Sequence, residues 1–146
     1  MTTDQTIDVA IIGGGPAGYA AAIYAARANL TTTVLEQGMS GGQIATSNEI
    51  ENYPGIPLLS GVELGERFQQ HAEGLGAQVE WSMVTGVDYD ADAAQFTIHH
   101  DMGDTAAKSV IACMGATPRP AGFVGEDTYR GRGVSYCATC DGMFFR

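Results

Sequence analysis

The chain has 146 residues, of which 45% are apolar, so it is long enough for a domain with a hydrophobic core and is not a disordered segment. Its net charge is −10 with only 7 Lys and Arg residues, and this negative field repels phosphate backbones, which argues against nucleic acid as a partner. Residues 1–6 lack the basic start of a signal peptide and no apolar run reaches membrane-spanning length, so we expect a cytoplasmic protein without a membrane partner.

The first predicted element is a buried parallel strand at residues 7–12 that leads into a glycine-rich turn. The turn has the spacing G-x-G-x-x-G and consists of Gly13, Gly14, Gly15, Pro16, Ala17 and Gly18. Its first glycine permits a tight turn, the second lets a pyrophosphate approach the backbone, and the third allows a helix to pack closely on the strand. Free N–H groups at the start of that helix favour an anion, so the turn predicts a dinucleotide site.

A second strand at residues 31–35 ends in Glu36. An acid at this place accepts hydrogen bonds from ribose hydroxyls, and its charge disfavours a 2′-phosphate. Glycine-rich turns also occur for purely structural reasons, but the strand, the helix and the acid together favour a dinucleotide site. The motif alone does not distinguish FAD from NAD.

Two more turns follow, at Gly41-Gly42 and at Pro54-Gly55. Gln43 and Asn52 lie close to these turns in the sequence, and their amides could read a planar ring that carries N–H and C=O groups. Composition alone favours the simpler interpretation, in which these are ordinary turns with polar loop residues.

The middle of the chain predicts one helix and several strands. An amphipathic helix is expected at residues 61–75, with candidate buried positions Val62, Leu64, Phe68 and Leu75. A third parallel strand is expected at 77–81, an antiparallel meander at 84–89, 95–100 and 105–109, and a further apolar run at 110–113. His99 and His100 point to opposite faces of a strand, so they do not form a metal pair.

Beyond Pro118 and Pro120 the chain becomes rich in glycine, which we interpret as a crossover to another domain. Cys137 and Cys140 then follow, with Asp141 beside them. Two thiols at this spacing can close into a disulfide and open again, and the acid can move a proton. A zinc site would need a second cysteine pair, and a structural disulfide is disfavoured in a cytoplasmic chain, so redox chemistry is the favoured interpretation.

Together these motifs resemble bacterial low-molecular-weight thioredoxin reductase, a class II pyridine nucleotide-disulfide oxidoreductase. The resemblance is carried by Gly13–Gly18, Glu36, Gly41-Gly42-Gln43, residues 51–55 and the run Cys137-Ala138-Thr139-Cys140-Asp141. Their order and spacing match across essentially the whole chain. The flavoprotein subunit of alkyl hydroperoxide reductase is similar in this region and is the related alternative; it carries an extra N-terminal module that is not seen here.

The resemblance implies an α/β fold with two parts. Residues 1–116 would form the N-terminal part of a Rossmann-like FAD-binding domain, with a parallel sheet and an antiparallel β-meander, and residues 117–146 the crossover and start of an NADPH-binding domain. The FAD site would include Asn52, the backbone near Val84 beside the adenine, and Gly115 near the flavin. Cys113 and Met114 stand where the family usually has a small residue and then Thr, and we interpret Cys113 as an inert buried thiol.

By the same resemblance, electrons pass from NADPH through FAD to a Cys137–Cys140 disulfide and on to thioredoxin. Cys140 would exchange electrons with the flavin, Cys137 would attack the thioredoxin disulfide, and Asp141 would act as general acid or base. A turn-capping role for Asp141 is compatible with this. The family also implies a homodimer, and without a second cysteine pair we expect no metal.

Family members continue into an NADPH-binding domain with its own glycine fingerprint, and this sequence holds only one such fingerprint. We therefore expect that the isolated chain does not oxidise NADPH. A flavin-binding module without turnover is the second interpretation, and a metal-binding Cys-x-x-Cys protein is the third.

Overall fold

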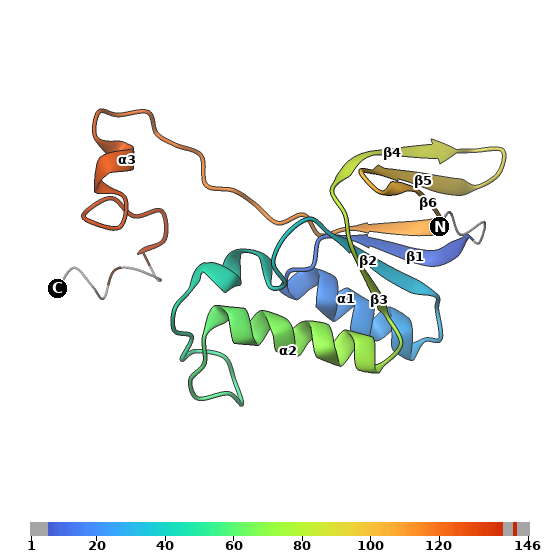
Figure 1. The fold of residues 1–146 in the computed structure, drawn as a ribbon, viewed down its shortest axis with the longest axis horizontal. Helices are drawn as coiled ribbons and strands as arrows, with labels where there is room; N and C mark the ends of the chain where they lie inside the picture. The colour runs from blue at the N-terminus through green and yellow to red at the C-terminus, as the bar shows by residue number, and fades with distance from the viewer. Residues whose placement is uncertain (1–5, 139–141, 143–146) are drawn as a thin grey trace. The chain divides into compact units, whose positions relative to one another are not determined.

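The computed structural model describes residues 6–138 and residue 142 (Figure 1). The chain divides into two compact units, Met1–Gly115 and Ala116–Arg146. Among the described residues, the first unit holds one sheet and two long helices, and the second holds the short helix α3 (Glu126–Tyr129). The assignment of these units to an FAD-binding and an NADPH-binding domain stays a prediction.

The first unit is built on a mixed sheet of six strands in the order β3-β2-β1-β6-β5-β4. Its strands are β1 (Ile7–Ile12), β2 (Thr32–Glu36), β3 (Gln78–Trp81), β4 (Val84–Asp90), β5 (Gln95–His100) and β6 (Gly103–Ala112). The pairs β1–β2, β2–β3 and β1–β6 are parallel, and β4–β5 and β5–β6 are antiparallel. The predicted parallel sheet with an antiparallel meander is therefore confirmed.

The strand β6 differs from its prediction. Residues 105–109 and 110–113 were expected as two separate runs, but Gly103–Ala112 is one continuous strand. Its first half pairs with β5 and its second half with β1, and Ala107 pairs with Phe96 on one side and Ile7 on the other. One strand thus joins the meander to the parallel strands, because a strand inside a sheet can pair along both edges.

Helices α1 (Pro16–Arg27) and α2 (Gly61–Gly74) lie side by side across one face of the parallel strands (Figure 1). Alternate residues of each strand point to opposite faces, so Val9 and Ile11 pack against these helices while Ala10 faces the other way. Ala10 belongs to a second core cluster that includes Ile98 of the meander. The two clusters thus cover opposite faces of the parallel strands.

The buried face of α2 corrects part of its prediction. Leu64 is buried and Phe68 packs against the core, as expected, but Val62 and Leu75 are 36% and 39% exposed. The buried stripe of α2 consists of Gly61, Leu64, Gly65 and Ala72. Two glycines in this stripe let the backbone of residues 40–47 lie directly on the helix, so Val62 is turned away and Leu75 lies just past the helix end.

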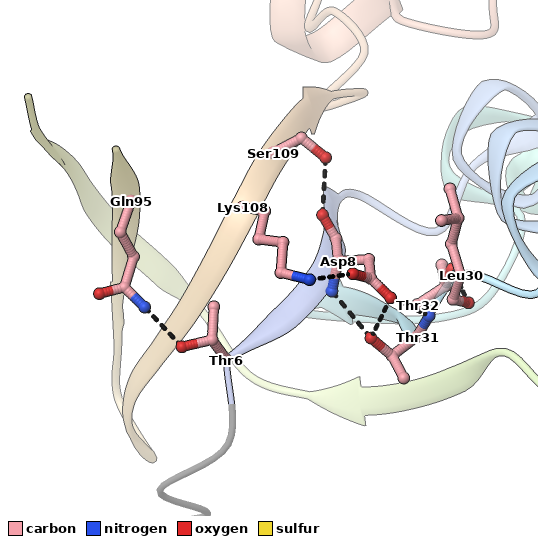
Figure 2. Close-up of polar contacts among 8 residues, drawn as sticks. All are labelled: Thr6, Asp8, Leu30, Thr31, Thr32, Gln95, Lys108 and Ser109. Atoms are coloured by element: carbon pink, nitrogen blue, oxygen red, sulfur yellow. Dashed lines mark hydrogen bonds and ion pairs between the residues drawn. The ribbon is translucent and has the colours of Figure 1, made fainter. Parts of the chain in front are cut away.

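A polar cluster joins the beginning of β1 to β6 and to Thr31, the residue before β2 (Figure 2). The Asp8 carboxylate accepts hydrogen bonds from Lys108 Nζ at 2.7 Å and from the Thr31 backbone N–H at 2.8 Å. The Thr31 and Ser109 hydroxyls also bond to Asp8, at 2.7 Å each. This cluster fastens the end of β1 that lies away from the glycine turn.

In the second unit, α3 (Glu126–Tyr129) follows a positive-φ glycine, Gly125. The Glu126 carboxylate is buried and accepts N–H bonds from Ala121 at 2.7 Å and Gly122 at 2.6 Å, and the Tyr136 hydroxyl also donates to it. Across residues 6–138 and 142, no helix has the length and apolar character needed to cross a membrane.

Candidate functional site

The glycine turn lies where β1 ends and α1 begins. Gly13 has φ +104° and donates its N–H to the Leu35 carbonyl at 2.9 Å. A Cβ at Gly13 would stand 2.4 Å from the Cys113 carbonyl oxygen, and one at Gly18 would stand 1.8 Å from the Gly13 carbonyl oxygen. Backbone therefore meets backbone on both sides of the turn, which is why both positions require glycine.

The first turn of α1 keeps its backbone N–H groups available. Pro16 begins the helix, the N-cap residue Gly15 has no side chain to cap it, and the Tyr19 N–H makes the first helical bond, to the Gly15 carbonyl. The N–H groups of Ala17 and Gly18 have no partner within the helix. A Cβ on Gly15 would make only an ordinary contact, 3.9 Å from the Gly41 carbonyl oxygen. N–H groups at the start of a helix favour an anionic group.

Glu36 lies next to the glycine turn at the end of β2. Its side chain is buried, and its two carboxylate oxygens accept hydrogen bonds from the Gly14 N–H at 2.5 Å and the Gly38 N–H at 2.8 Å. A carboxylate has about four acceptor positions, so each oxygen can still accept a further bond. Glu36 can thus orient the turn and bind a hydroxyl group simultaneously.

The second glycine turn is held against the first. Gly41 and Gly42 have φ of +102° and +56°, and the Gly41 N–H donates to the Gly14 carbonyl at 2.8 Å. A Cβ at Gly41 would lie 2.9 Å from the Cα of Gly65 in α2. The structure therefore brings residues 13–18, Glu36 and the Gly41–Gly42 turn together at the carboxyl ends of β1 and β2.

The remaining predicted cofactor residues follow the second glycine turn in the sequence. Gln43 is exposed in the 3₁₀ helix η1 (Gly42–Thr46), and Asn52 is exposed on the loop that follows. Among the described residues, no hydrogen bond joins the Asn52 side chain to the glycine turns. Val84 is half-buried at the start of β4, close to Ser82, whose N–H donates to the Glu36 carbonyl at 2.9 Å.

Gly115 ends the first unit. It has φ +69°, and it follows Met114, whose Cα would lie 3.3 Å from a Cβ on Gly13. The preceding residue, Cys113, is a free thiol that packs against the core, and burial raises the pKa of its thiol. A raised pKa keeps the sulfur in its unreactive thiol form, which agrees with the inert role expected of Cys113.

Three residues at this site were not among the predicted ones. Tyr19 and Ser40 are buried, and their hydroxyl oxygens are 2.7 Å apart; the Ser40 hydroxyl also donates to Gln69. Burial raises the pKa of the Tyr19 phenol. Their positions in the sequence could have indicated them, because Tyr19 directly follows Gly18 and Ser40 directly precedes Gly41. A buried tyrosine also needs a hydrogen-bond partner for its hydroxyl.

Of the predicted catalytic residues, Cys137 is described, and Cys140 and Asp141 lie outside the described residues. Cys137 is half-buried and disulfide-bonded, and its N–H donates to the Ser135 hydroxyl at 3.0 Å. Tyr136, directly before it, donates its hydroxyl to Glu126, and the Arg130 guanidinium carbon lies over its ring, 5.0 Å from the ring centroid. In the described part of the chain, no group of three or more His, Cys, Asp or Glu residues could hold a metal ion.

Residues 7–146 match the family model described as pyridine nucleotide-disulphide oxidoreductase. The chain belongs to this family. Within the family, it is 40% identical over 147 residues to a thioredoxin reductase of Bacillus subtilis and 45% identical over 143 residues to one of Peptoclostridium acidaminophilum. These alignments cover 100% and 97% of this chain.

The fold agrees with that of solved members of the family. The thioredoxin reductase of Streptococcus pyogenes matches with a TM-score of 0.83 and 41% identity, over 99% of this chain and 46% of that one. The predicted resemblance to thioredoxin reductase is therefore confirmed. The chain spans about half the length of the curated relatives that it matches, 46% and 45% of the two reductases above.

Proposed function

We propose that the chain is the flavin-binding and dithiol-bearing part of a thioredoxin-disulfide reductase. The observation that carries the proposal is the joint placement of the two glycine turns and Glu36 at one edge of the sheet. The names of the relatives support the reaction, because thioredoxin reductases match essentially the whole chain. Electrons would come from NADPH, for which this chain offers no second glycine fingerprint.

The described residues fit FAD. The N–H groups that begin α1 would bind the pyrophosphate, and the free acceptor positions of Glu36 would bind the ribose hydroxyls. The full proposed set is Gly13, Gly14, Gly15, Pro16, Ala17, Gly18, Glu36, Gly41, Gly42, Gln43, Asn52, Val84 and Gly115. Bound FAD would supply a store of two electrons between NADPH and the dithiol.

The proposed work of the dithiol is thiol–disulfide exchange. The Cys137 thiolate attacks one sulfur of the thioredoxin disulfide, a mixed disulfide forms, and the other thioredoxin sulfur leaves as a thiolate. The Cys140 thiolate then attacks Cys137, which closes the Cys137–Cys140 disulfide and releases reduced thioredoxin. Asp141 would deliver and remove the protons. Two electrons thus pass to thioredoxin for each disulfide closed here.

The first test is the visible absorption spectrum of the purified protein after FAD is added and the excess removed. Retained flavin bands support the proposed site, and a colourless full-length protein contradicts it. The second measurement is thioredoxin reduction with NADPH, for wild type and for Cys140→Ser. We expect the variant to keep flavin and to lose turnover. Equal turnover by Cys140→Ser would rule out the proposed dithiol.

A second candidate function is a flavin-binding module without turnover. The observation in its favour is that these 146 residues contain one glycine fingerprint, Gly13–Gly18, which would serve the flavin. The two functions are separated by supplying NADPH and thioredoxin to the 146-residue chain and to the longest natural polypeptide that contains it. Turnover by the longer polypeptide alone supports the reductase, and flavin binding without turnover by both supports the module.

Size-exclusion chromatography of the longer polypeptide tests the proposed homodimer, and fractionation of cells tests the proposed cytoplasmic location.

A further inference from the structure

A hydrogen-bonded chain of polar side chains connects α1, the loop before η1 and α2, and it runs from buried Tyr19 and Ser40 through half-buried Gln69 to exposed Glu73. The hydroxyl oxygens of Tyr19 and Ser40 lie 2.7 Å apart, and the Ser40 hydroxyl donates to Gln69 Oε1. Gln69 Nε2 in turn donates to Glu73 Oε1 at 3.0 Å. Tyr19 is 0% exposed and Ser40 is 5% exposed, so water does not replace these bonds.

The Glu73 carboxylate, at the last position of this hydrogen-bonded chain, sets the direction of every hydrogen bond in it. The Glu73 carboxylate only accepts, so the Gln69 amide must turn its NH₂ group to Glu73 and its oxygen to Ser40. Ser40 gives its one proton to that oxygen, and it must therefore accept from the Tyr19 hydroxyl. All donors point the same way, and hydrogen bonds aligned in this manner strengthen one another.

The Tyr19 end of this chain touches the candidate flavin site. A Cβ on Gly14 would lie 2.9 Å from the Tyr19 hydroxyl and 3.1 Å from Glu36 Oε2, so both oxygens border the same point beside the turn. Ser40 immediately precedes Gly41, whose N–H bonds to the Gly14 carbonyl. The hydrogen-bonded chain thus contacts the first turn through Tyr19 and the second through Ser40.

We propose that Tyr19, Ser40 and Gln69 are positioning residues that hold the two glycine turns at the spacing a flavin dinucleotide needs. The role rests on the proposed flavin site. Glycine-rich backbone loses much conformational freedom when it is ordered, and Gly41 and Gly42 both adopt positive φ. A buried hydrogen-bonded anchor next to them fixes the turn before the ligand arrives, so less of the binding free energy is lost on ordering.

The test is the affinity for FAD of the full-length apoprotein, measured by quenching of flavin fluorescence. Tyr19→Phe removes one hydroxyl and keeps the buried ring, and we expect its Kd for FAD to rise about tenfold, as for loss of one buried hydrogen bond. Tyr24→Phe is the matched control, because Tyr24 lies on the same helix and is 73% exposed. Its Kd should equal that of wild type.

Ser40→Ala and the double variant Tyr19→Phe/Ser40→Ala test whether the residues act as a unit. If they do, the Kd of the double variant rises no further than that of Ser40→Ala alone. A lowered melting temperature of Tyr19→Phe with an unchanged Kd for FAD overturns the positioning role and leaves the flavin site intact. Wild type that binds no FAD overturns the proposed function, and the positioning role with it.

Discussion

At the scale of single residues, glycine marks the places where backbone packs on backbone around the candidate site. A Cβ at Gly18, Gly61 or Gly65 would stand 1.8 Å, 1.7 Å or 2.3 Å from a carbonyl oxygen. No side-chain rotation relieves such contacts, because both partners are main chain. These glycines therefore set how closely α1 and α2 approach the loops that form the site.

The substitution Gly18→Ala tests this reading of the glycines. The new methyl group would collide with the Gly13 carbonyl, so we expect a loss of about 3 kcal/mol in the free energy of unfolding, the upper end of what overpacking costs. Urea denaturation of the purified protein measures it. Gly74→Ala is the control, because no atom lies within 4 Å of a Cβ there, and it should gain about 0.5–1 kcal/mol. Equal stability of the two variants would show that the turn yields to the methyl group.

At the scale of elements, α2 packs against the loop that contains the second glycine turn. The helix begins at Ser60, whose hydroxyl accepts the Glu63 N–H at 3.1 Å, and Glu63 pairs with Arg67 at 2.7 Å. A side-chain cap satisfies one N–H that the first turn leaves open. The Gly61 N–H in that first turn donates to the Ser47 carbonyl, so the helix start and the loop end are joined.

Ser60→Ala removes the cap while it leaves the buried stripe of α2 unchanged. We expect the free energy of unfolding to fall by about 1 kcal/mol, the typical cost of a lost N-cap. Thermal or urea unfolding provides the measurement. Ser60→Asp keeps an acceptor at the same place and should stay close to wild type. If Ser60→Asp lost as much stability as Ser60→Ala, the hydrogen bond to Glu63 would not be the cause.

The elements also show what could be predicted from sequence and why the rest could not. Strand periodicity and the glycine spacing predicted β1, α1 and β2, because these features are local; the Gly14–Glu36 hydrogen bond joins residues 22 apart and was not predicted. The predicted burial of Val62 was wrong, because the buried side of α2 is set by a loop whose close approach no pattern in α2 encodes. The Tyr19–Ser40 bond joins residues 21 apart, so only the fold brings them together. The roles assigned to Cys137 and its neighbours stay predictions.

At the scale of the whole molecule, the first unit depends on contacts between distant parts of the chain. Asp8 lies in β1, and its partners Thr31 and Lys108 are 23 and 100 residues away in the sequence (Figure 2). Strands β1 and β6 are parallel, and their carboxyl ends lead to Gly13 and toward Gly115 at the same edge of the sheet. A charge at Asp8 therefore contributes to the order of the sheet that supports the site.

Asp8 should make the stability of this sheet depend on pH in the acid range. The bond from Lys108, and then those from Thr31, hold the pKa of the Asp8 carboxyl well below its usual range. A lowered pKa in the folded state stabilises the fold above the unfolded-state pKa of about 3.9, and this contribution is lost as the pH falls from there toward the folded pKa. Asp8→Asn should therefore unfold at lower urea concentration than wild type at pH 7, and the difference should shrink toward pH 2.

The control is Asp92→Asn, in an exposed turn, which should match wild type throughout. A difference between Asp8→Asn and wild type that stayed constant from pH 7 to pH 2 would assign the effect to the lost contacts themselves, because the other titrating groups are the same in both proteins and only the charge of Asp8 differs between them.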